Sequence, residues 1–367
     1  MTDQELRTVL AEFDIKSNIE SVAPLGNGLI NDTFRVNVSD EKSPGYVLQR
    51  INNAVFTDVD LLQHNIEVVT DHVRQKLMDN GASDIERRVL HFVKAKKTGL
   101  TYYKDNEGRY WRVSRFIPRA FTYETVTTES SYEAGVAFGD FERMLVDVPE
   151  SLGETIPDFH NMELRANQLH EAVATDPLGR VKEVGDMLDI VESDVEEMCK
   201  AERMCREGKL PKRICHCDTK VNNMMFDENG DVLCVIDLDT VMPNFIFSDY
   251  GDFLRTGANF VAEDDPNIEK VGFNMEIFKA FTSGYLSTAS TFLIPAETDN
   301  LPYAAALFPF MQGVRFLTDY INGDVYYKIK YPAHNLDRSR NQFALYTDVR
   351  RHDEEMANYV NSCLKKD

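Results

Sequence analysis

Apolar and polar residues alternate along the first third of the chain, in short runs separated by turn-forming residues. The run at 21–38 alternates around a glycine turn, and a second run at 45–51 follows the turn-rich residues SDEKSPG. A period of two places successive side chains on opposite faces of a strand, so these runs predict antiparallel β-strands. Further strands are predicted in three later runs, the last two joined by NEG as a hairpin turn: 88–96, 100–105 and 110–117.

Helical periodicity appears in the acidic N-terminus at 1–15 and again at 58–79, where an aspartate precedes the apolar stripe and can cap the helix. After Pro118 the pattern is mostly helical. The predicted helices are 130–148, 162–176, 184–205, 268–287 and 301–323.

A β island at 222–239 interrupts these helices. It consists of two apolar runs around ENGD, in which Asn-Gly supplies the positive φ angles of a tight hairpin turn. The change of character near Pro118 predicts two lobes, 1–117 as an N-terminal nucleotide-binding lobe and 118–367 as a C-terminal catalytic and substrate-binding lobe.

The charge balance argues against two classes of partner. The 367 residues contain 40 Lys and Arg against 61 Asp and Glu, a formal net charge of −21. Binding of nucleic acid requires clustered basic residues, and an anionic membrane surface would repel this chain. We expect a cytoplasmic protein, because the sequence shows no secretory signal and no apolar stretch of bilayer length. The six cysteines form no disulfide framework and the pair flanking His216 lacks the paired spacing of a zinc site, so we expect free, buried thiols.

The stretch HCDTKVNNMMF at 216–226 places several polar side chains directly before an apolar run. Polar side chains at this position do not stabilise a buried strand, since burial of unpaired polar groups costs free energy. His216, Asp218 and Asn223 fit H-x-D-x-x-x-x-N, the spacing of the kinase catalytic loop. The hairpin that follows ends in VIDLD, which places Asp237 where such enzymes keep a metal-binding carboxylate. Motif and layout together predict an α+β, protein-kinase-like bilobal fold, with a small antiparallel-sheet N-lobe and a mainly helical C-lobe.

Phosphoryl transfer explains these residue types, because it requires an aligned hydroxyl and neutralisation of the phosphate charge by Mg²⁺. Asp218 is the predicted base, and Asn223 and Asp237 supply the hard oxygen ligands that magnesium prefers. Lys220 is predicted to balance charge on the transferring group. His216 is expected to hydrogen-bond the loop backbone rather than to act as a base.

Asp239 and the turn of the hairpin each allow a second interpretation. Asp239 either faces the metal as well or caps the strand. A calcium-binding loop at DENGDVLCVIDL is rejected, because Gly230 falls at position four rather than six and position twelve is Leu238.

The first hairpin is the predicted phosphate-covering loop. Gly26 and Gly28 lie in GNGLINDTF, although G-x-G is also an ordinary hairpin turn. Arg50 occupies the third-strand position where kinases place a cation on the α- and β-phosphates, and Glu67 on the following helix is predicted to orient it.

Several segments resemble the aminoglycoside phosphotransferase and choline kinase superfamily, and within it the bacterial N-acetylhexosamine 1-kinases. They are GNGLINDTF, YVLQRIN, ETIPDFHNMELR, HCDTKVNNMMFD, VIDLDTVMP, DYGDFLR and GVRFLTDYINGDVYY. The resemblance implies ATP and Mg²⁺ as cofactors, and a free hexosamine that is phosphorylated on its anomeric hydroxyl to a sugar 1-phosphate. It also implies that Asp218, Lys220, Arg315 and Tyr326 contact the sugar and that Asp249 braces the catalytic loop.

Two positions depart from the family pattern: Leu29 stands where a sugar-contacting His is usual, and Asn244 stands in place of Gly. Because polar groups let a pocket reject close analogues, these departures leave the sugar undefined. Two other functions remain open: a kinase that phosphorylates an amino alcohol such as choline, homoserine or an aminoglycoside, and a catalytically inactive kinase fold that serves as a binding module.

Overall fold

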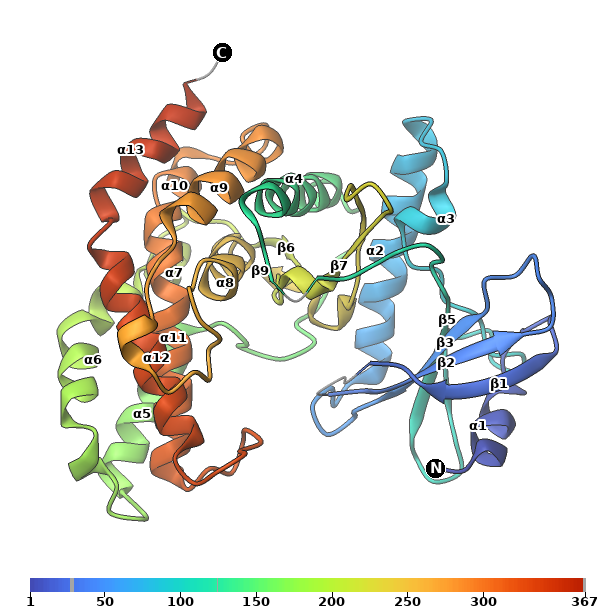
Figure 1. The fold of residues 1–367 in the computed structure, drawn as a ribbon, viewed down its shortest axis with the longest axis horizontal. Helices are drawn as coiled ribbons and strands as arrows, with labels where there is room; N and C mark the ends of the chain where they lie inside the picture. Colours follow the sequence, from blue (N-terminus) through green and yellow to red (C-terminus); the bar gives the residue numbers. More distant parts are fainter. Residues whose placement is uncertain (27–29, 124, 366–367) are drawn as a thin grey trace. The chain divides into compact units, whose positions relative to one another are not determined.

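The computed structural model describes residues 1–26, 30–123 and 125–365, and it divides into two compact units (Figure 1). The sheet unit comprises Met1–Thr122, Asp147–Pro157 and Met224–Met242, and the helical unit comprises Tyr123–Val146, Asp158–Asn223 and Pro243–Asp367. Two later segments therefore join the N-terminal part of the chain, which a linear division at residue 117 does not include. None of the helices in the described ranges is both long and apolar enough to cross a membrane.

The sheet unit contains the strands of the N-terminal half and the later hairpin. Its elements are α1 (Asp3–Leu10), β1 (Ile19–Pro24), β2 (Asp32–Val38), β3 (Tyr46–Ile51), α2 (Val59–Asp79), α3 (Ile85–Arg88), β4 (Tyr102–Lys104), β5 (Tyr110–Arg115), β7 (Met224–Phe226) and β8 (Val232–Val235).

The helical unit follows the predicted change of pattern. Its elements are α4 (Thr128–Leu145), α5 (Met162–Thr175), α6 (Gly185–Met198), α7 (Lys200–Arg206), β6 (Arg213–Cys215), α8 (Phe247–Gly257), α9 (Met275–Ala289), α10 (Pro295–Thr298), α11 (Leu301–Asn322), α12 (His334–Arg350) and α13 (Asp353–Leu364). β9 (Met242–Asn244) begins at the last residue of the sheet unit.

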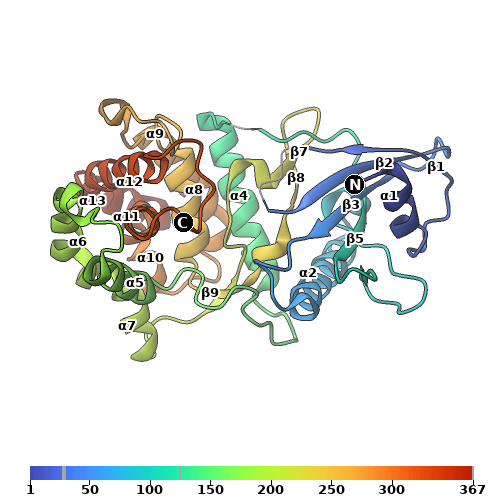
Figure 2. The ribbon, with the colours of Figure 1, turned by 90° about the horizontal axis from the view of Figure 1, so that it is seen from below.

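The five-stranded sheet has the order β1-β2-β3-β5-β4, and its printed pairings are antiparallel. Helix α1 begins with a capping box between Thr2 and Glu5 and buries its apolar stripe against the sheet (Figure 2). Alternation along β5 directs Trp111 and Val113 into this core and Arg112 to the opposite face. The predicted antiparallel sheet with helices in the C-terminal part is confirmed.

The hairpin predicted at 222–239 is confirmed as the antiparallel pair β7 and β8, but its turn is longer than two residues. Asp227 accepts backbone N–H groups from Asn229 and Asp231, and Gly230 has a φ of 90°. The carboxylate of Asp227 thus stabilises the turn.

The strand predicted at 88–96 is wrong as a continuous strand. Helix α3 ends at Arg88, and the backbone of the segment then pairs with β5 at the isolated bridge of Phe92 with Ser114 instead of forming a strand. Val89, Val93 and Ala95 are buried. The alternation therefore reports burial of side chains rather than a ladder of backbone hydrogen bonds.

Two predicted helices have other bounds in the structure. The helix at 184–205 breaks at Cys199, where the hydroxyl of Tyr303 bonds to the carbonyl of Met198 and the N–H of Ala201. The helix at 268–287 begins only at Met275, because the side chain of Asn274 accepts the first free N–H groups and caps it there.

Candidate active site

The polar stretch at 216–223 forms a loop that follows β6 and is fastened to α8. Cys217 has a φ of 62°, a conformation that a non-glycine residue rarely adopts. The buried Asp249 accepts the backbone N–H groups of His216 and Cys217, both at 2.7 Å, and its carbonyl accepts the hydroxyl of Thr219 at 2.6 Å. These bonds are what the predicted bracing role of Asp249 requires. The residue does not cap α8, whose N-cap position is Ile246.

The ring of His216 is enclosed by aromatic rings of α4. It makes edge contacts with Phe138 and Phe141 at centroid distances of 5.9 and 6.1 Å. Its Nδ1 accepts the N–H of Asp218 at 3.3 Å. His216 therefore contacts the loop backbone from a fully buried position.

Asp218 lies between two of its predicted partners. Lys220 Nζ is 2.7 Å from Asp218 Oδ1, and Asn223 Nδ2 donates to Asp218 Oδ2 at 3.1 Å and to the Asp218 carbonyl at 2.8 Å. The Asp218 side chain is 26% exposed, so it is accessible from solvent. The structure thus brings three of the predicted site residues into one hydrogen-bonded group.

Electrostatics keep Asp218 ionised. Burial raises the pKa of its carboxyl, but the charge and hydrogen bond of Lys220, with smaller contributions from His216 and Asn223, outweigh burial and leave the pKa lowered. Burial lowers the pKa of Lys220, and Asp218 and Asp252 outweigh it, so that this pKa is raised. At neutral pH the pair is a carboxylate beside an ammonium group.

Asp237 lies in the sheet unit, shortly after the end of β8 at Val235, with an exposed side chain and a φ of 59°. Asp239, two residues later, is buried, and both of its carboxylate oxygens have partners. Its Oδ1 is 2.5 Å from Arg112 Nη1, its Oδ2 accepts Asn31 Nδ2 at 2.7 Å, and its carbonyl accepts the hydroxyl of Thr155 at 3.0 Å. Asp239 therefore anchors the segment that carries Asp237, and its carboxylate oxygens are already engaged.

The chemistry of the predicted metal ligands fits a magnesium ion. Both side-chain hydrogen bonds of Asn223 within the described ranges use Nδ2, which leaves Oδ1 as a neutral oxygen donor. Asp237 adds a carboxylate. Carboxylate and amide oxygens are hard ligands of the kind that Mg²⁺ binds.

The predicted nucleotide-binding residues belong to the sheet unit. Gly26 has a φ of 67° before β2, a conformation that favours glycine, whereas Gly28 and the neighbouring Leu29 lie outside the described residues. The guanidinium of Arg50 pairs with Asp32 on the adjacent strand, and no ion pair joins it to Glu67 among the residues that the structure describes. Glu67 lies half-buried on α2.

Arg315 and Tyr326, predicted as sugar contacts, both line a cavity of about 430 Å³ in the helical unit. Arg165 of α5 lines the same cavity. No sequence pattern identified it as a site residue, although it ends the family-like segment ETIPDFHNMELR. Burial, together with the charge of Arg315, lowers the pKa of Arg165 to about 10. Arg165 therefore remains a cation at neutral pH.

Electrostatic neighbours connect this cavity with the catalytic loop. Burial raises the pKa of Tyr327, a residue lining the cavity, and Glu263 raises it further. Burial also raises the pKa of Glu263, but Arg255, which lies 2.6 Å from it, and Lys220 outweigh burial and leave the pKa lowered. Glu263 therefore interacts electrostatically with Tyr327 in the cavity wall and with Lys220 beside Asp218.

Asn244, the second departure from the family pattern, lies behind the loop. Its Nδ2 approaches Cys217 Sγ at 3.6 Å, and its carbonyl accepts the thiol of Cys215 at 3.6 Å. Its side chain is buried. Asn244 supports the strained Cys217 and does not line the cavity.

Solved structures with the same fold are distant in sequence. An aminoglycoside phosphotransferase from Alicyclobacillus acidocaldarius superposes with a TM-score of 0.61 at 12% identity, over 95% of this chain and 96% of that one. Choline kinase from Cryptosporidium parvum gives a TM-score of 0.57 at 15% identity over 99% of both chains. An amicoumacin kinase in complex with AMP-PNP, Ca²⁺ and Ami gives 0.59 at 14% identity over 95% of both chains. These likenesses confirm the predicted kinase-like fold class.

The sequence itself matches the model of one family, described as the phosphotransferase enzyme family, over residues 21–280. The matched range includes the catalytic loop, the hairpin with Asp237 and the bracing Asp249. Since the match covers well over half of the chain, this protein belongs to the phosphotransferase enzyme family.

Proposed function

We propose that the protein transfers the γ-phosphoryl group of ATP to the anomeric hydroxyl of an N-acetylhexosamine or a related sugar, giving ADP and a sugar 1-phosphate. The observation that carries the proposal is the carboxylate of Asp218, which is accessible and held between Lys220 and Asn223. A structural neighbour in complex with AMP-PNP and Ca²⁺ supports the use of a nucleotide and a divalent ion.

Asp218 orients the sugar hydroxyl and takes its proton as the oxygen bonds to the γ-phosphorus and the bond from phosphorus to ADP breaks. A carboxylate with a lowered pKa is a weak base, which suits a loose transition state in which the proton moves late. Lys220 moves no proton in this scheme. Its ammonium group holds Asp218 in place and balances the negative charge that gathers on the transferring group.

Asn223 and Asp237 would hold the magnesium ion. When bound, the ion would neutralise phosphate charge. The contribution of the chain is to present two hard oxygen ligands, one on the braced catalytic loop and one on the segment anchored through Asp239.

Arg165 and Arg315 support a sugar as the acceptor, because guanidinium groups donate hydrogen bonds to hydroxyl and acetamide oxygens. The acidic residues Glu171 and Asp319 line the same cavity, so its charges alone do not separate a sugar from an amino alcohol. The aromatic rings of Phe159 and Tyr327, which a quaternary amine would need, already lie under Arg315 at 5.4 and 5.7 Å.

Incubation of the protein with ATP, Mg²⁺ and a panel of sugars and amino alcohols tests this proposal, with phosphorus NMR to identify the product. Formation of a sugar 1-phosphate supports it. If an amino alcohol is phosphorylated and no sugar is, the acceptor is that amino alcohol and the sugar proposal is wrong. If the protein binds nucleotide and phosphorylates no acceptor in the panel, the binding-module reading gains support.

Asp237→Ala is expected to abolish the stabilisation by nucleotide and Mg²⁺. Ligand binding to the folded state raises the melting temperature by mass action, so the loss is visible in a thermal-shift titration. Asp231→Ala is the matched control, because Asp231 is an exposed aspartate in the turn of the same hairpin. Retention of the wild-type shift by Asp237→Ala would remove Asp237 as a ligand.

Arg315→Met is expected to raise the KM for the sugar about tenfold or more and to leave the KM for ATP unchanged. The lost interaction is a hydrogen bond from a charged donor, and such bonds contribute roughly 1.5–3 kcal/mol. Arg340→Met, on the partly exposed side of α12, is the control. Equal sugar KM values in wild type and Arg315→Met would show that the cavity is not the acceptor site.

A further inference from the structure

Glu142 is a buried carboxyl group for which the mechanism above has no role. It is only 2% exposed, and it bonds to Tyr285 of α9. Its own helix, α4, packs against α9 (Figure 1). The two helices approach closely because Gly135 and Gly284 leave room for backbone. A Cβ at Gly135 would lie 2.2 Å from the carbonyl oxygen of Phe281, and one at Gly284 would lie 2.0 Å from that of Tyr132. This close packing brings Glu142 into the interior.

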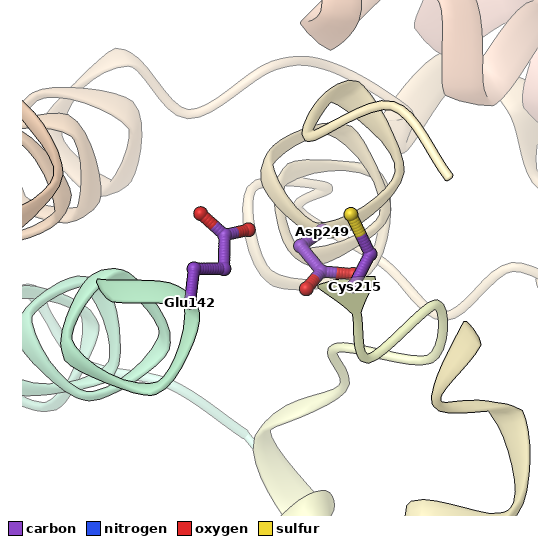
Figure 3. A group of neighbouring side chains, drawn as sticks. All are labelled: Glu142, Cys215 and Asp249. Atoms are coloured by element: carbon purple, nitrogen blue, oxygen red, sulfur yellow. The ribbon is translucent and has the colours of Figure 1, made fainter. Parts of the chain in front are cut away.

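Glu142 reaches Asp249, the residue that braces the catalytic loop. Carboxyl oxygens of Glu142 and Asp249 and the sulfur of Cys215 lie within 4.8 Å of one another (Figure 3). Glu142 Oε2 accepts the hydroxyl of Tyr285 at 2.5 Å. Glu142 Oε1 is buried without a hydrogen-bond donor.

A metal ion does not suit this cluster. The thiol of Cys215 donates to the carbonyl of Asn244, so it is protonated, and the two oxygens of Asp249 already accept backbone N–H groups. A proton does suit it. Two adjacent buried carboxylates cannot both stay ionised, and one proton shared between them removes the repulsion.

We propose that Glu142 is held as a neutral carboxylic acid whose Oε1–H donates a hydrogen bond to Asp249, which makes Glu142 a positioning residue for the catalytic loop. The proton belongs on Glu142 because Asp249 is the better stabilised anion. Asp249 has two N–H donors at 2.7 Å, whereas Glu142 has one hydroxyl donor. The same proton gives the otherwise unpartnered Oε1 its bond.

Two further facts agree with this assignment. Burial, with the charge of Asp249 as the next cause, raises the pKa of Glu142 well above its usual range. Burial also raises the pKa of Asp249, while its hydrogen bond with Glu142 acts in the opposite direction and favours the anion.

The result is one continuous chain of hydrogen bonds. It runs from Tyr285 through Glu142 to Asp249 and on to the N–H groups of His216 and Cys217, immediately before Asp218. The neutral acid fixes the rotamer of Asp249, and Asp249 keeps Cys217 in its left-handed conformation. Glu142 therefore acts on catalysis through the loop and does not touch substrate.

Two variants of Glu142 separate hydrogen bonding from packing. Glu142→Gln retains a donor to Asp249 and an acceptor for Tyr285, so its kcat is expected to match wild type. Glu142→Leu fills a similar volume without a donor and is expected to lose roughly 10- to 100-fold in kcat with KM unchanged, because small misplacements of a catalytic group have effects of this order. Glu129→Gln, on the exposed first turn of α4, is the control. Full activity of Glu142→Leu, or equal losses in both variants, would overturn the proposal.

Infrared spectroscopy tests the protonation directly and is independent of the proposed function, on which only the kinetic readout rests. The wild-type spectrum at neutral pH, minus that of Glu142→Gln, is expected to contain the C=O stretch of a protonated carboxyl group. A difference spectrum with only carboxylate bands would overturn the assignment even if Glu142→Leu failed to fold. Failure of the sugar assay leaves this measurement unaffected.

Discussion

Asp218→Asn is expected to lower kcat by about 10²-fold or more, while nucleotide binding stays close to wild type. The amide preserves the shape of the side chain and its bond with Asn223 can be kept, but it cannot accept the proton of the sugar hydroxyl. General-base catalysis contributes roughly 10²–10⁴-fold, which sets the size of the loss. Steady-state rates of sugar 1-phosphate formation, together with a nucleotide titration, measure both quantities.

The matched control for this variant is Asp299→Asn, an exposed aspartate in the helical unit. Its kcat and melting temperature are expected to equal those of wild type. If Asp218→Asn keeps full activity while folded and nucleotide-bound, Asp218 is not the base, and the reaction must use another group of the loop.

The local part of the site was readable from sequence because it is short. His216, Asp218 and Asn223 lie within eight residues, and their spacing alone predicted a polar loop at the start of an apolar run. The structure places Lys220 and Asn223 on the two carboxylate oxygens of Asp218. A local hydrogen-bond pattern of this kind depends on few long-range contacts.

The contacts that hold the segment of Asp237 in place could not be predicted from the sequence, because they join residues that are far apart in the chain. Arg112 and Asp239 are 127 residues apart, and Asn31 and Asp239 are 208 apart. The alternation of β5 showed only that Arg112 faces away from Trp111 and Val113. The partner of Arg112 depends on where the later hairpin joins the sheet unit, and the periodicity of a strand carries no such information.

Helix α12 was not predicted from the sequence, for a second reason. It has no clear apolar stripe, and its buried face includes Asn335, Ser339 and Asn341. These side chains are satisfied by specific partners, such as Asp319 for Asn335 and the carbonyl of Gly313 for Ser339. A rule based on apolar spacing cannot detect a helix that is buried through hydrogen bonds.

Arg112→Met is expected to have the largest effect on stability, a loss of about 3–5 kcal/mol in the free energy of unfolding of the sheet unit. Arg112 and Asp239 form an ion pair with side chains only 3% and 4% exposed. Removal of one partner leaves an uncompensated charge in the interior, and this cost exceeds the strength of the pair itself. Trp111, the single tryptophan, is buried beside Arg112 in sequence and reports this transition by its fluorescence in urea.

Two comparisons separate this effect from a general loss of an arginine. Arg115→Met removes an ion pair on the same strand whose partners are 49% and 56% exposed, and such pairs contribute at most about 1 kcal/mol. Adding Asp239→Asn to Arg112→Met removes the stranded charge and is expected to restore part of the lost stability. If Arg112→Met loses no more than Arg115→Met, the pair does not anchor the segment that carries Asp237. Asp237 would then owe its position to the backbone of the hairpin alone.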